Sequence, residues 1–211
     1  MSGAAKPEAN RPLVICDCDE VLLRMVGPFR DWLASEHDID FTLKNDFSDA
    51  LHYRATGEPV ERQDVWRLLA AFFDTEMDRQ DPFPGAIEAL NTLAETADVV
   101  ILTNLLDERA QARKAQLAGH GLDIEVYTNQ GPKGPAIRRI VEEHAPGKVA
   151  FIDDLPQHHA SAAQDYPDSI RLHMCGEPEL SPHIDCAYEA GHAHARIDNW
   201  DEALPWLLER L

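Results

Sequence analysis

The sequence predicts an α/β fold in which a central parallel sheet lies between layers of helices. Three observations support this prediction: short apolar runs without polar interruption, helical patterns that alternate with them, and polar residues directly after several runs. Residues 22–82 carry no clear strand pattern, so we expect a small α-helical cap inserted after the first strand. The predicted core domain therefore comprises residues 1–21 and 83–211, and the predicted cap domain residues 22–82.

The first strand is expected at residues 13–15, a short β-branched run typical of a strand buried on both faces. Within the predicted cap, bulky apolar residues recur at helical spacing over residues 28–37 and 61–77, which predicts two helices. A proline-rich break at residues 81–85 follows. We expect the chain to return to the core there.

From residue 84 the alternation of helices and strands becomes regular. Asp107 is suited to cap one of these helices, and Pro135 and Pro156 stand at favoured positions in the first turns of two others. The expected helices cover residues 84–97, 107–118, 134–144 and 199–211, with one more beginning at residue 156, and the expected strands cover residues 98–103, 124–127, 148–152 and 169–173.

Composition and charge narrow the classes of function. Hydrophobic residues make up 44% of the 211 residues, which is enough for a packed core. The net charge of -19 disfavours nucleic-acid polymers and anionic membranes as partners, and we expect neither. No apolar run is long enough to span a bilayer, residues 1–12 have the composition of a short disordered lead, and four cysteines indicate a reducing cytoplasm.

Polar groups able to do chemistry follow three of the apolar strands. Asp17 and Asp19 follow the first strand, Thr103-Asn104 ends a second, and Asp153-Asp154 ends a third. Because the carboxyl ends of parallel strands share one edge of a sheet, these groups can meet there. Lys133 precedes a helix N-terminus, which adds backbone N–H donors and a partial positive charge. Clustered carboxylates repel each other, and a hard cation such as Mg²⁺ relieves that repulsion while it binds a substrate phosphate.

The order of these groups, Asp-x-Asp, Thr, Lys and Asp-Asp, resembles the haloacid dehalogenase (HAD) superfamily of phosphohydrolases. VICDCDEVL resembles its first motif, VVILTN its second, GPKG its third and VAFIDDLP its fourth. The resemblance covers about residues 1–30 and 82–175, and it implies a Rossmann-like three-layer core with a cap. Response-regulator receivers use a similar set of groups, but with the acidic pair first and the lysine last, so the order here counts against them.

The resemblance also implies roles for the acidic residues. Asp17 would be the nucleophile that attacks phosphorus to form an aspartyl-phosphate, and Asp19 would protonate the leaving oxygen and then deprotonate water. Asp17, the backbone carbonyl of Asp19 and the pair Asp153 and Asp154 would hold Mg²⁺, with the directly bound member of the pair left open. An acid at Asp19 favours phosphate transfer over dehalogenation, because a halide leaving group needs no proton.

Thr103, Asn104 and Lys133 are the candidate substrate-binding residues, since a hydroxyl, an amide and an ammonium can hold phosphoryl oxygens. The implied function is Mg²⁺-dependent hydrolysis of a small phosphorylated metabolite in the cytoplasm. Two alternatives stay open. One is a catalytically silent module that binds a phosphorylated ligand or a protein partner, and the other is a phosphotransferase or mutase that uses the same aspartyl intermediate.

A second metal site is an alternative for the tail of the chain. Six residues that could bind zinc lie within 22 positions: His173, Cys175, His183, Cys186, His192 and His194. Their gaps follow none of the tight spacings of known zinc motifs, so the spacing favours structural roles and leaves zinc open.

Several other polar residues have a functional and a structural interpretation. His158 and His159 are expected to be exposed on their helix, although they lie near enough to touch a substrate. Arg54, Arg62 and Arg67 could reach a second anionic group of a substrate, but exposed arginines more often form surface ion pairs.

Overall fold

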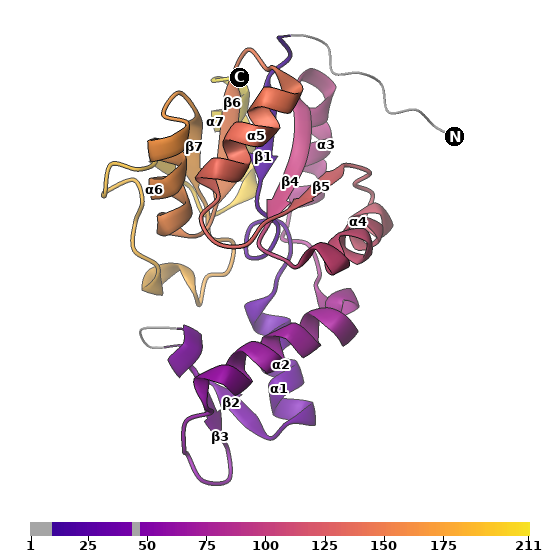
Figure 1. Ribbon diagram of the computed structural model, residues 1–211, viewed down its shortest axis with the longest axis vertical. Helices are drawn as coiled ribbons and strands as arrows, with labels where there is room; N and C mark the ends of the chain where they lie inside the picture. Colours follow the sequence, from indigo (N-terminus) through magenta and orange to yellow (C-terminus); the bar gives the residue numbers. More distant parts are fainter. Residues whose placement is uncertain (1–9, 44–46) are drawn as a thin grey trace.

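The computed structural model describes residues 10–43 and 47–211. The predicted disordered lead falls mainly on residues 1–9, which lie outside the described residues. Helices occupy both faces of a central sheet, and a smaller unit, which contains α1 and α2, lies beyond the ends of its strands (Figure 1). The α/β architecture predicted from the sequence is confirmed.

A six-stranded parallel sheet forms the centre of the fold, in the order β5-β4-β1-β6-β7-β8. Its strands are β1 (Leu13–Cys16), β4 (Asp98–Thr103), β5 (Glu125–Thr128), β6 (Val149–Asp153), β7 (Ile170–His173) and β8 (Ala195–Arg196). Cys16 lies opposite Ile101 of β4 and Ile152 of β6. The strand β1 is therefore central, and its carboxyl end is flanked by the ends of β4 and β6.

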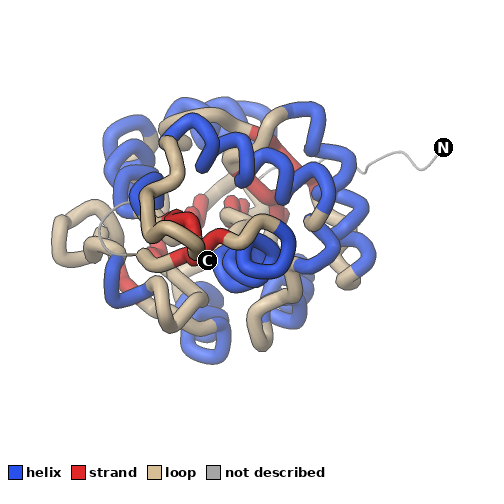
Figure 2. Tube along the Cα trace, turned by 90° about the horizontal axis from the view of Figure 1, so that it is seen from below, coloured by secondary structure: helices blue, strands red, loops and turns tan. Residues whose placement is uncertain are grey.

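Alternate residues of the buried strands face two different hydrophobic layers, as a pleated strand requires. Val14 and Cys16 pack in the layer formed with α3 and α7, whereas Leu13 and Ile15 pack in the layer formed with α5 and α6. The seven helices of the described chain are α1 (Val26–Glu36), α2 (Arg62–Thr75), α3 (Ala86–Thr96), α4 (Ala110–Gly119), α5 (Gly134–His144), α6 (Pro156–Asp165) and α7 (Trp200–Leu208). Figure 2 shows these helices surrounding the strands when the molecule is seen from the end that carries α1 and α2.

The start of α4 differs from the prediction. Asp107 does not cap this helix; it begins a short 3-10 turn, Asp107–Arg109, and α4 has no side-chain cap. The Thr128 hydroxyl donates a hydrogen bond to the Asp107 carboxylate, which binds this turn to the neighbouring strand β5. The carboxylate is therefore already engaged by a side chain instead of by backbone N–H groups.

The segment predicted as a purely helical cap also contains two strands, β2 (Ile39–Phe41) and β3 (Leu51–Tyr53), paired antiparallel. Each strand has only three residues, too few for an alternating pattern to stand out in the sequence. With α1 and α2 they surround a cluster rich in aromatic residues, including Phe29, Trp32 and Phe72. The boundaries at residues 22 and 82 remain a prediction.

One core residue is buried in this cap cluster. Leu105, which follows Thr103-Asn104 after β4, is only 3% exposed and packs with the cap residues. On the other side of the junction, Val26 of α1 packs against Cys175 and Leu180 of the core. The cap therefore contacts the core through apolar side chains on two sides.

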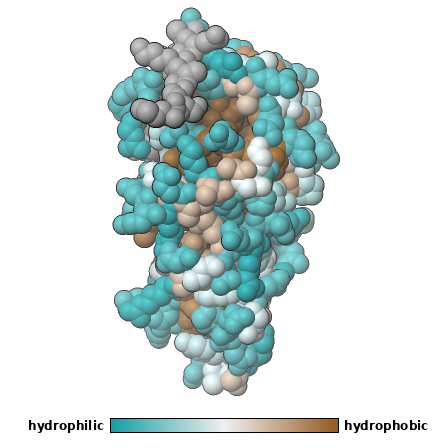
Figure 3. All heavy atoms as spheres, turned by 90° about the vertical axis from the view of Figure 1, so that its right-hand side faces the viewer, coloured by the Kyte–Doolittle hydropathy of each residue, from teal (hydrophilic) through white to brown (hydrophobic). Residues whose placement is uncertain are grey.

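The tail adds the edge strand β8 and the closing helix α7. Asn199 caps α7, with its side-chain oxygen accepting a hydrogen bond from the Glu202 N–H at 2.9 Å. Figure 3 shows a largely hydrophilic surface on one face, with hydrophobic side chains gathered mostly in the half that holds the sheet. Among the residues that the structure describes, no helix combines the length and apolar character needed to cross a bilayer.

Candidate active site

Three strand ends bring their polar residues together, as predicted. Asp17 follows β1, Thr103 ends β4 and Asp153 ends β6, and these three strands are neighbours in the sheet. Asp17, Asp153 and Asp154 each offer a carboxylate oxygen, and these oxygens lie within 4.8 Å of one another. All three side chains are buried, and Thr103, the last residue of the neighbouring strand β4, is buried as well.

Lys133 joins two of these carboxylates. Its ammonium lies 2.8 Å from Asp17 Oδ1 and 2.6 Å from Asp153 Oδ2, and the residue has no exposed surface. Burial alone would lower the pKa of Lys133, but the carboxylates of Asp153 and Asp17 raise it above its ordinary value. Lys133 is therefore a permanently charged group between two acids from different strands.

The local sequence explains how Lys133 reaches this position. It is the N-cap residue of α5, which begins at Gly134 with Pro135 in its first turn. A side chain at Gly134 would collide with the backbone of Ser161 in α6, with a Cβ only 2.4 Å from the Ser161 carbonyl oxygen. The glycine thus lets α5 begin close against α6, which directs the preceding lysine toward the strand ends.

The site gathers three carboxyl groups around a single ammonium. Burial raises the pKa of Asp17 to about 7, with Lys133 opposing and Asp153 adding to that rise. Burial and the neighbouring Asp153 and Asp17 likewise raise the pKa of Asp154 well above its usual range. Burial is the strongest single influence on Asp153 and opposes its ionisation, but Lys133 together with His158 and His159 holds the pKa of that carboxyl below its usual range. A single ammonium cannot neutralise three carboxylates, so the oxygen set fits a hard divalent cation.

Asp19 has different surroundings from Asp17, only two residues away. Arg113 of α4 donates to both of its carboxylate oxygens, at 2.9 and 3.1 Å, and Gln80 from the end of the cap donates to Oδ1 at 2.7 Å. The Asp19 side chain is not part of the group of three carboxylates. A role for Asp19 as a metal ligand through its backbone carbonyl remains a prediction.

Arg113 was not predicted as a site residue. It is fully buried, its guanidinium lies over the Phe73 ring of the cap at 5.6 Å, and it also contacts Cys18 and Gln116. The only sequence signal is its position one helical turn before Leu117, on the inward face of α4. A lone arginine in an otherwise polar helix gives no indication of a buried ion pair.

Asn104 links the loop after β4 to the loop after β5 and to the first turn of α6. Its amide nitrogen donates to the Gly131 carbonyl at 3.0 Å and lies 3.4 Å from His158 Nε2, while its oxygen accepts from Asn129 at 2.9 Å. This amide is therefore engaged with the protein, and its predicted contact with substrate remains a prediction.

The prediction that His158 and His159 are exposed is wrong. His158 is 5% exposed and His159 is fully buried. Both lie in the first turn of α6, which packs against the sheet and α5, and His159 shares its inward face with Ala162. The ring of His159 packs at 5.3 Å from the Phe151 ring of β6. Packing of the helix N-terminus against the sheet overrode the expected exposure of these polar side chains.

The tail residues do not gather into a zinc site. Within the described ranges, the group of Asp17, Asp153 and Asp154 is the only set of three or more potential ligands from His, Cys, Asp and Glu. His173 instead contacts the Asp154 carbonyl and the Ala187 N–H, and His194 accepts from the Arg171 N–H. Backbone groups thus account for the two tail histidines that lie nearest the sheet.

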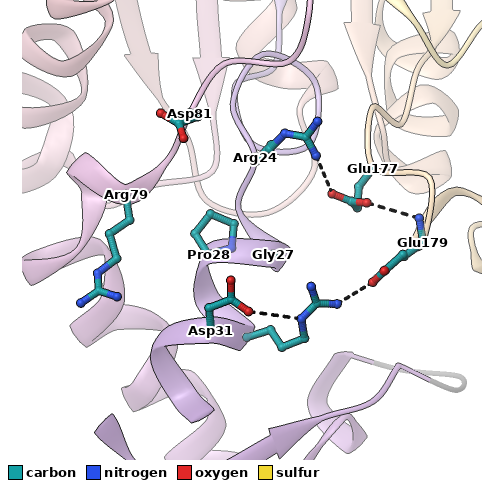
Figure 4. Close-up of a pocket in the computed structure, with 9 residues that line it drawn as sticks. Arg24, Gly27, Pro28, Asp31, Arg79, Asp81, Glu177 and Glu179 are labelled. Atoms are coloured by element: carbon teal, nitrogen blue, oxygen red, sulfur yellow. Dashed lines mark hydrogen bonds and ion pairs between the residues drawn. The ribbon is translucent and has the colours of Figure 1, made fainter. Parts of the chain in front are cut away.

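A separate open pocket of about 460 Å³ lies at the junction of cap and core (Figure 4). It is lined by Arg24, Gly27, Pro28, Arg30, Asp31, Arg79, Asp81, Glu177 and Glu179. Arg24 pairs with Glu177 at 3.2 Å, and Arg30 pairs with Glu179. Both arginines point toward acids of the core, so these pairs bind the cap to the segment after β7.

Comparison with solved structures identifies the fold. A haloacid dehalogenase-like hydrolase from Streptococcus pneumoniae aligns with a TM-score of 0.64 at 13% identity, covering 92% of this chain and 97% of that one. A candidate β-phosphoglucomutase from Thermotoga maritima gives 0.62 at 17% identity, covering 95% and 100%. A candidate phosphoglycolate phosphatase from Lactobacillus delbrueckii gives 0.64 at 14% identity, covering 94% and 98%.

No protein-family profile matches the sequence, and no curated protein matches it. The structural similarity extends over nearly the whole chain, including the cap, in all three solved structures. The chain thus has the fold of the haloacid dehalogenase superfamily, as the order of its four motifs predicted.

Proposed function

We propose that this protein is a Mg²⁺-dependent phosphohydrolase that releases phosphate from a small phosphorylated substrate through an aspartyl-phosphate on Asp17. The observation that carries the proposal is the junction of Asp17, Lys133, Asp153 and Asp154 at one sheet edge. The fold supports it, because the similar solved structures include proteins named as hydrolases and phosphatases.

In the first step, a carboxylate oxygen of Asp17 attacks phosphorus and the bond from phosphorus to the leaving oxygen breaks. Lys133 holds Asp17 through Oδ1, as does the Cys18 N–H at 2.7 Å, which fixes the rotation of this carboxylate. Thr103 at the end of β4 would donate to an oxygen of the phosphoryl group. These groups position the reactants and offset negative charge, which is most of what phosphoryl transfer requires.

In the second step, water attacks the phosphorus of the aspartyl-phosphate, and Asp17 and inorganic phosphate are released. Asp19 would give a proton to the leaving oxygen in the first step and take one from water in the second. Arg113 and Gln80 donate to the Asp19 carboxylate, an arrangement suited to the second task. For the first task the Asp19 side chain has to turn away from Arg113.

Asp17, Asp153 and Asp154 would hold the metal ion. When bound, Mg²⁺ supplies positive charge to the phosphoryl oxygens and allows the three acids to ionise together. The raised pKa values of Asp17 and Asp154 follow from burial among like charges, which is the situation that a divalent cation relieves.

The decisive experiment is the substitution Asp17→Asn, followed by measurement of phosphate release from an aryl phosphate. We expect turnover to vanish while the thermal unfolding transition stays cooperative, because the amide cannot act as the nucleophile. Chelation of Mg²⁺ should abolish the activity of the unmodified protein, and added Mg²⁺ should restore it. Undiminished turnover by the Asp17→Asn variant would refute the proposal.

Transfer to a second substrate is the other function that an observation favours, because one similar structure is named as a candidate β-phosphoglucomutase. Transfer would use the same Asp17 intermediate with a sugar hydroxyl in place of water. Incubation of a sugar phosphate and analysis of both free phosphate and isomeric sugar phosphates distinguishes the two. The proposal includes a small phosphorylated metabolite as the substrate and the cytoplasm as the location. The four free cysteines agree with a reducing compartment.

A further inference from the structure

Two buried histidines lie beneath the Asp153–Asp154 step, and the catalytic steps proposed above do not use them. His159 of α6 places Nε2 at 2.9 Å from the Asp153 carbonyl oxygen. His173, the last residue of β7, places Nε2 at 2.8 Å from the Asp154 carbonyl oxygen. Both side chains are fully buried. The main-chain carbonyl of each of these two adjacent acids is therefore hydrogen-bonded to a different histidine ring.

The hydrogen-bond partners determine which nitrogen of each ring carries the proton. The Ala187 N–H donates to His173 Nδ1 at 3.0 Å, so this nitrogen is bare and Nε2 carries the hydrogen. A carbonyl oxygen can only accept, so His159 Nε2 also carries a hydrogen. Burial lowers the pKa of both rings, that of His159 to about 4, so both are neutral N–H donors at neutral pH.

Packing fixes the positions of both rings. Their centroids lie 5.3 Å apart, and His159 packs on Phe151 at the same distance. The Met174 N–H also donates to the Asp153 carbonyl, at 2.9 Å. The carbonyls of both acids are therefore held by donors in fixed positions, which restricts rotation of the peptide groups that carry the two carboxylates.

We propose that His159 and His173 are positioning residues that orient the main chain of Asp153 and Asp154 so that both carboxylates face the divalent cation. This inference rests on the proposed function, because it needs a metal ion at the three carboxylates. Groups that orient metal ligands change affinity for the metal without touching it. The arrangement also links the metal site to the tail, since His173 connects Asp154 to the segment that contains Ala187.

The test compares substitutions that keep the shape of the ring with substitutions that keep the donor. His159→Phe and His173→Phe retain a planar ring but remove the N–H. His159→Gln and His173→Gln retain an N–H donor at a similar distance from the backbone. The exposed residue His183 provides the matched control, as His183→Phe and His183→Gln.

Binding of Mg²⁺ and Mn²⁺ is measured directly by calorimetry, without substrate, on each folded variant. We expect the Phe variants at 159 and 173 to bind about tenfold more weakly, the Gln variants to recover most of the affinity, and both His183 variants to bind like the unmodified protein. In phosphatase assays, the Phe variants should need more Mg²⁺ for half-maximal rate, while the KM for the aryl phosphate at saturating Mg²⁺ stays unchanged.

The outcomes separate this inference from the proposed function. If the unmodified protein binds neither ion, the proposed metal-dependent function fails and the inference falls with it. If it binds and the Phe variants bind equally well, the inference alone is overturned. Should a Phe variant fail to fold, His→Asn at the same position replaces it, because the shorter amide does not reach the carbonyl. The same tenfold weakening is then expected for Asn, with recovery in Gln.

Discussion

Asp17 and Asp19 stand two residues apart, yet the molecule surrounds them differently. Asp17 faces Lys133 and Asp153, groups that come from the ends of core elements. Asp19 faces Arg113 of α4 and Gln80 at the end of the cap. The comparison shows that one half of the site is made by core elements alone, namely strand ends and the start of α5, and that the other half also needs Gln80 at the end of the cap.

The two surroundings predict that substitutions near Asp17 and substitutions near Asp19 impair different properties of the protein. Changes around Asp17 should affect the charge balance among buried acids, and with it metal binding and the fold itself. Changes around Asp19 should affect proton transfer and leave metal binding intact. Four predictions test the separation, in order of decreasing effect.

Removal of the lysine should have the largest effect. In Lys133→Met, Asp17 and Asp153 lose their shared cation, and an uncompensated buried charge costs about 3–5 kcal/mol of stability. We expect phosphate release to fall by at least about 1000-fold and the unfolding temperature to drop, measured by a phosphate assay and calorimetry. Lys114→Met, at an exposed pair with Glu125, is the control and should change neither.

Removal of the arginine should reduce catalysis without reducing metal affinity. Arg113→Met removes the Nη2 group that donates to both oxygens of Asp19, and we expect kcat to fall about 10- to 100-fold, as for general acid–base groups. Calorimetric Mg²⁺ binding should be unchanged, because Arg113 does not contact the three carboxylates. Loss of Mg²⁺ affinity in this variant would remove the distinction between the two halves. Arg113→Lys keeps the charge but loses the planar guanidinium whose Nη2 contacts both Asp19 oxygens, so an intermediate kcat is expected.

Glu20, beside Asp19, should make stability depend on pH. Its Oε1 accepts from the Met25 and Val26 N–H groups at the start of α1, and burial raises its pKa from 4.5 to about 7. The folded protein therefore binds this proton more tightly than the unfolded chain, so the free energy of unfolding falls as pH rises from about 4.5 to about 7. In the unmodified protein this loss amounts to about 3 kcal/mol above pH 7.

The side chain of the Glu20→Gln variant cannot ionise, so this variant should not lose stability as the pH rises from about 4.5 to about 7. Measured with chelator present, the variant should match the unmodified protein in unfolding temperature near pH 4 and exceed it at pH 8. A difference that is the same at both pH values would contradict the assignment. Glu179→Gln, an exposed acid of the junction, serves as the control for general charge effects.

The ion pairs at the rim of the junction should matter least. Arg30→Ala removes the pair with Glu179, whose two side chains are 40% and 72% exposed. We expect less than about 1 kcal/mol of lost stability by denaturant unfolding, with phosphate release unchanged. A larger effect would show that the junction depends on its rim charges more than on its apolar contacts.

The half of the site around Asp17 could be predicted from the sequence, because its geometry follows from local rules. A buried strand that ends in acids places them at the edge of a parallel sheet, and a lysine before a helix N-terminus points the same way. The strands at residues 98–103 and the helix at residues 134–144 agree with the structure residue for residue. The strand ends at Thr103 and the helix follows Lys133, whereas Asp153 ends β6, which runs one residue later than the strand predicted at residues 148–152.

The half around Asp19 could not be predicted, because its partners depend on tertiary contacts. Arg113 and Gln80 lie 94 and 61 residues along the chain from Asp19, and neither belongs to a motif. The same reason accounts for the buried His159, whose helix could be predicted but not its packing. The strands of the cap and β8 have two or three residues each, which is too short for a periodic pattern.

Leu105 links the cap to the loop that follows β4. This side chain belongs to the core by sequence but is buried among the cap's apolar residues, one position after Asn104. Moving the cap away from the core as a rigid body would expose the Leu105 side chain to water, at a free-energy cost of about 2 kcal/mol. Under the proposed function, substrate entry by such a movement either costs this free energy or moves the Thr103–Asn104 turn together with the cap.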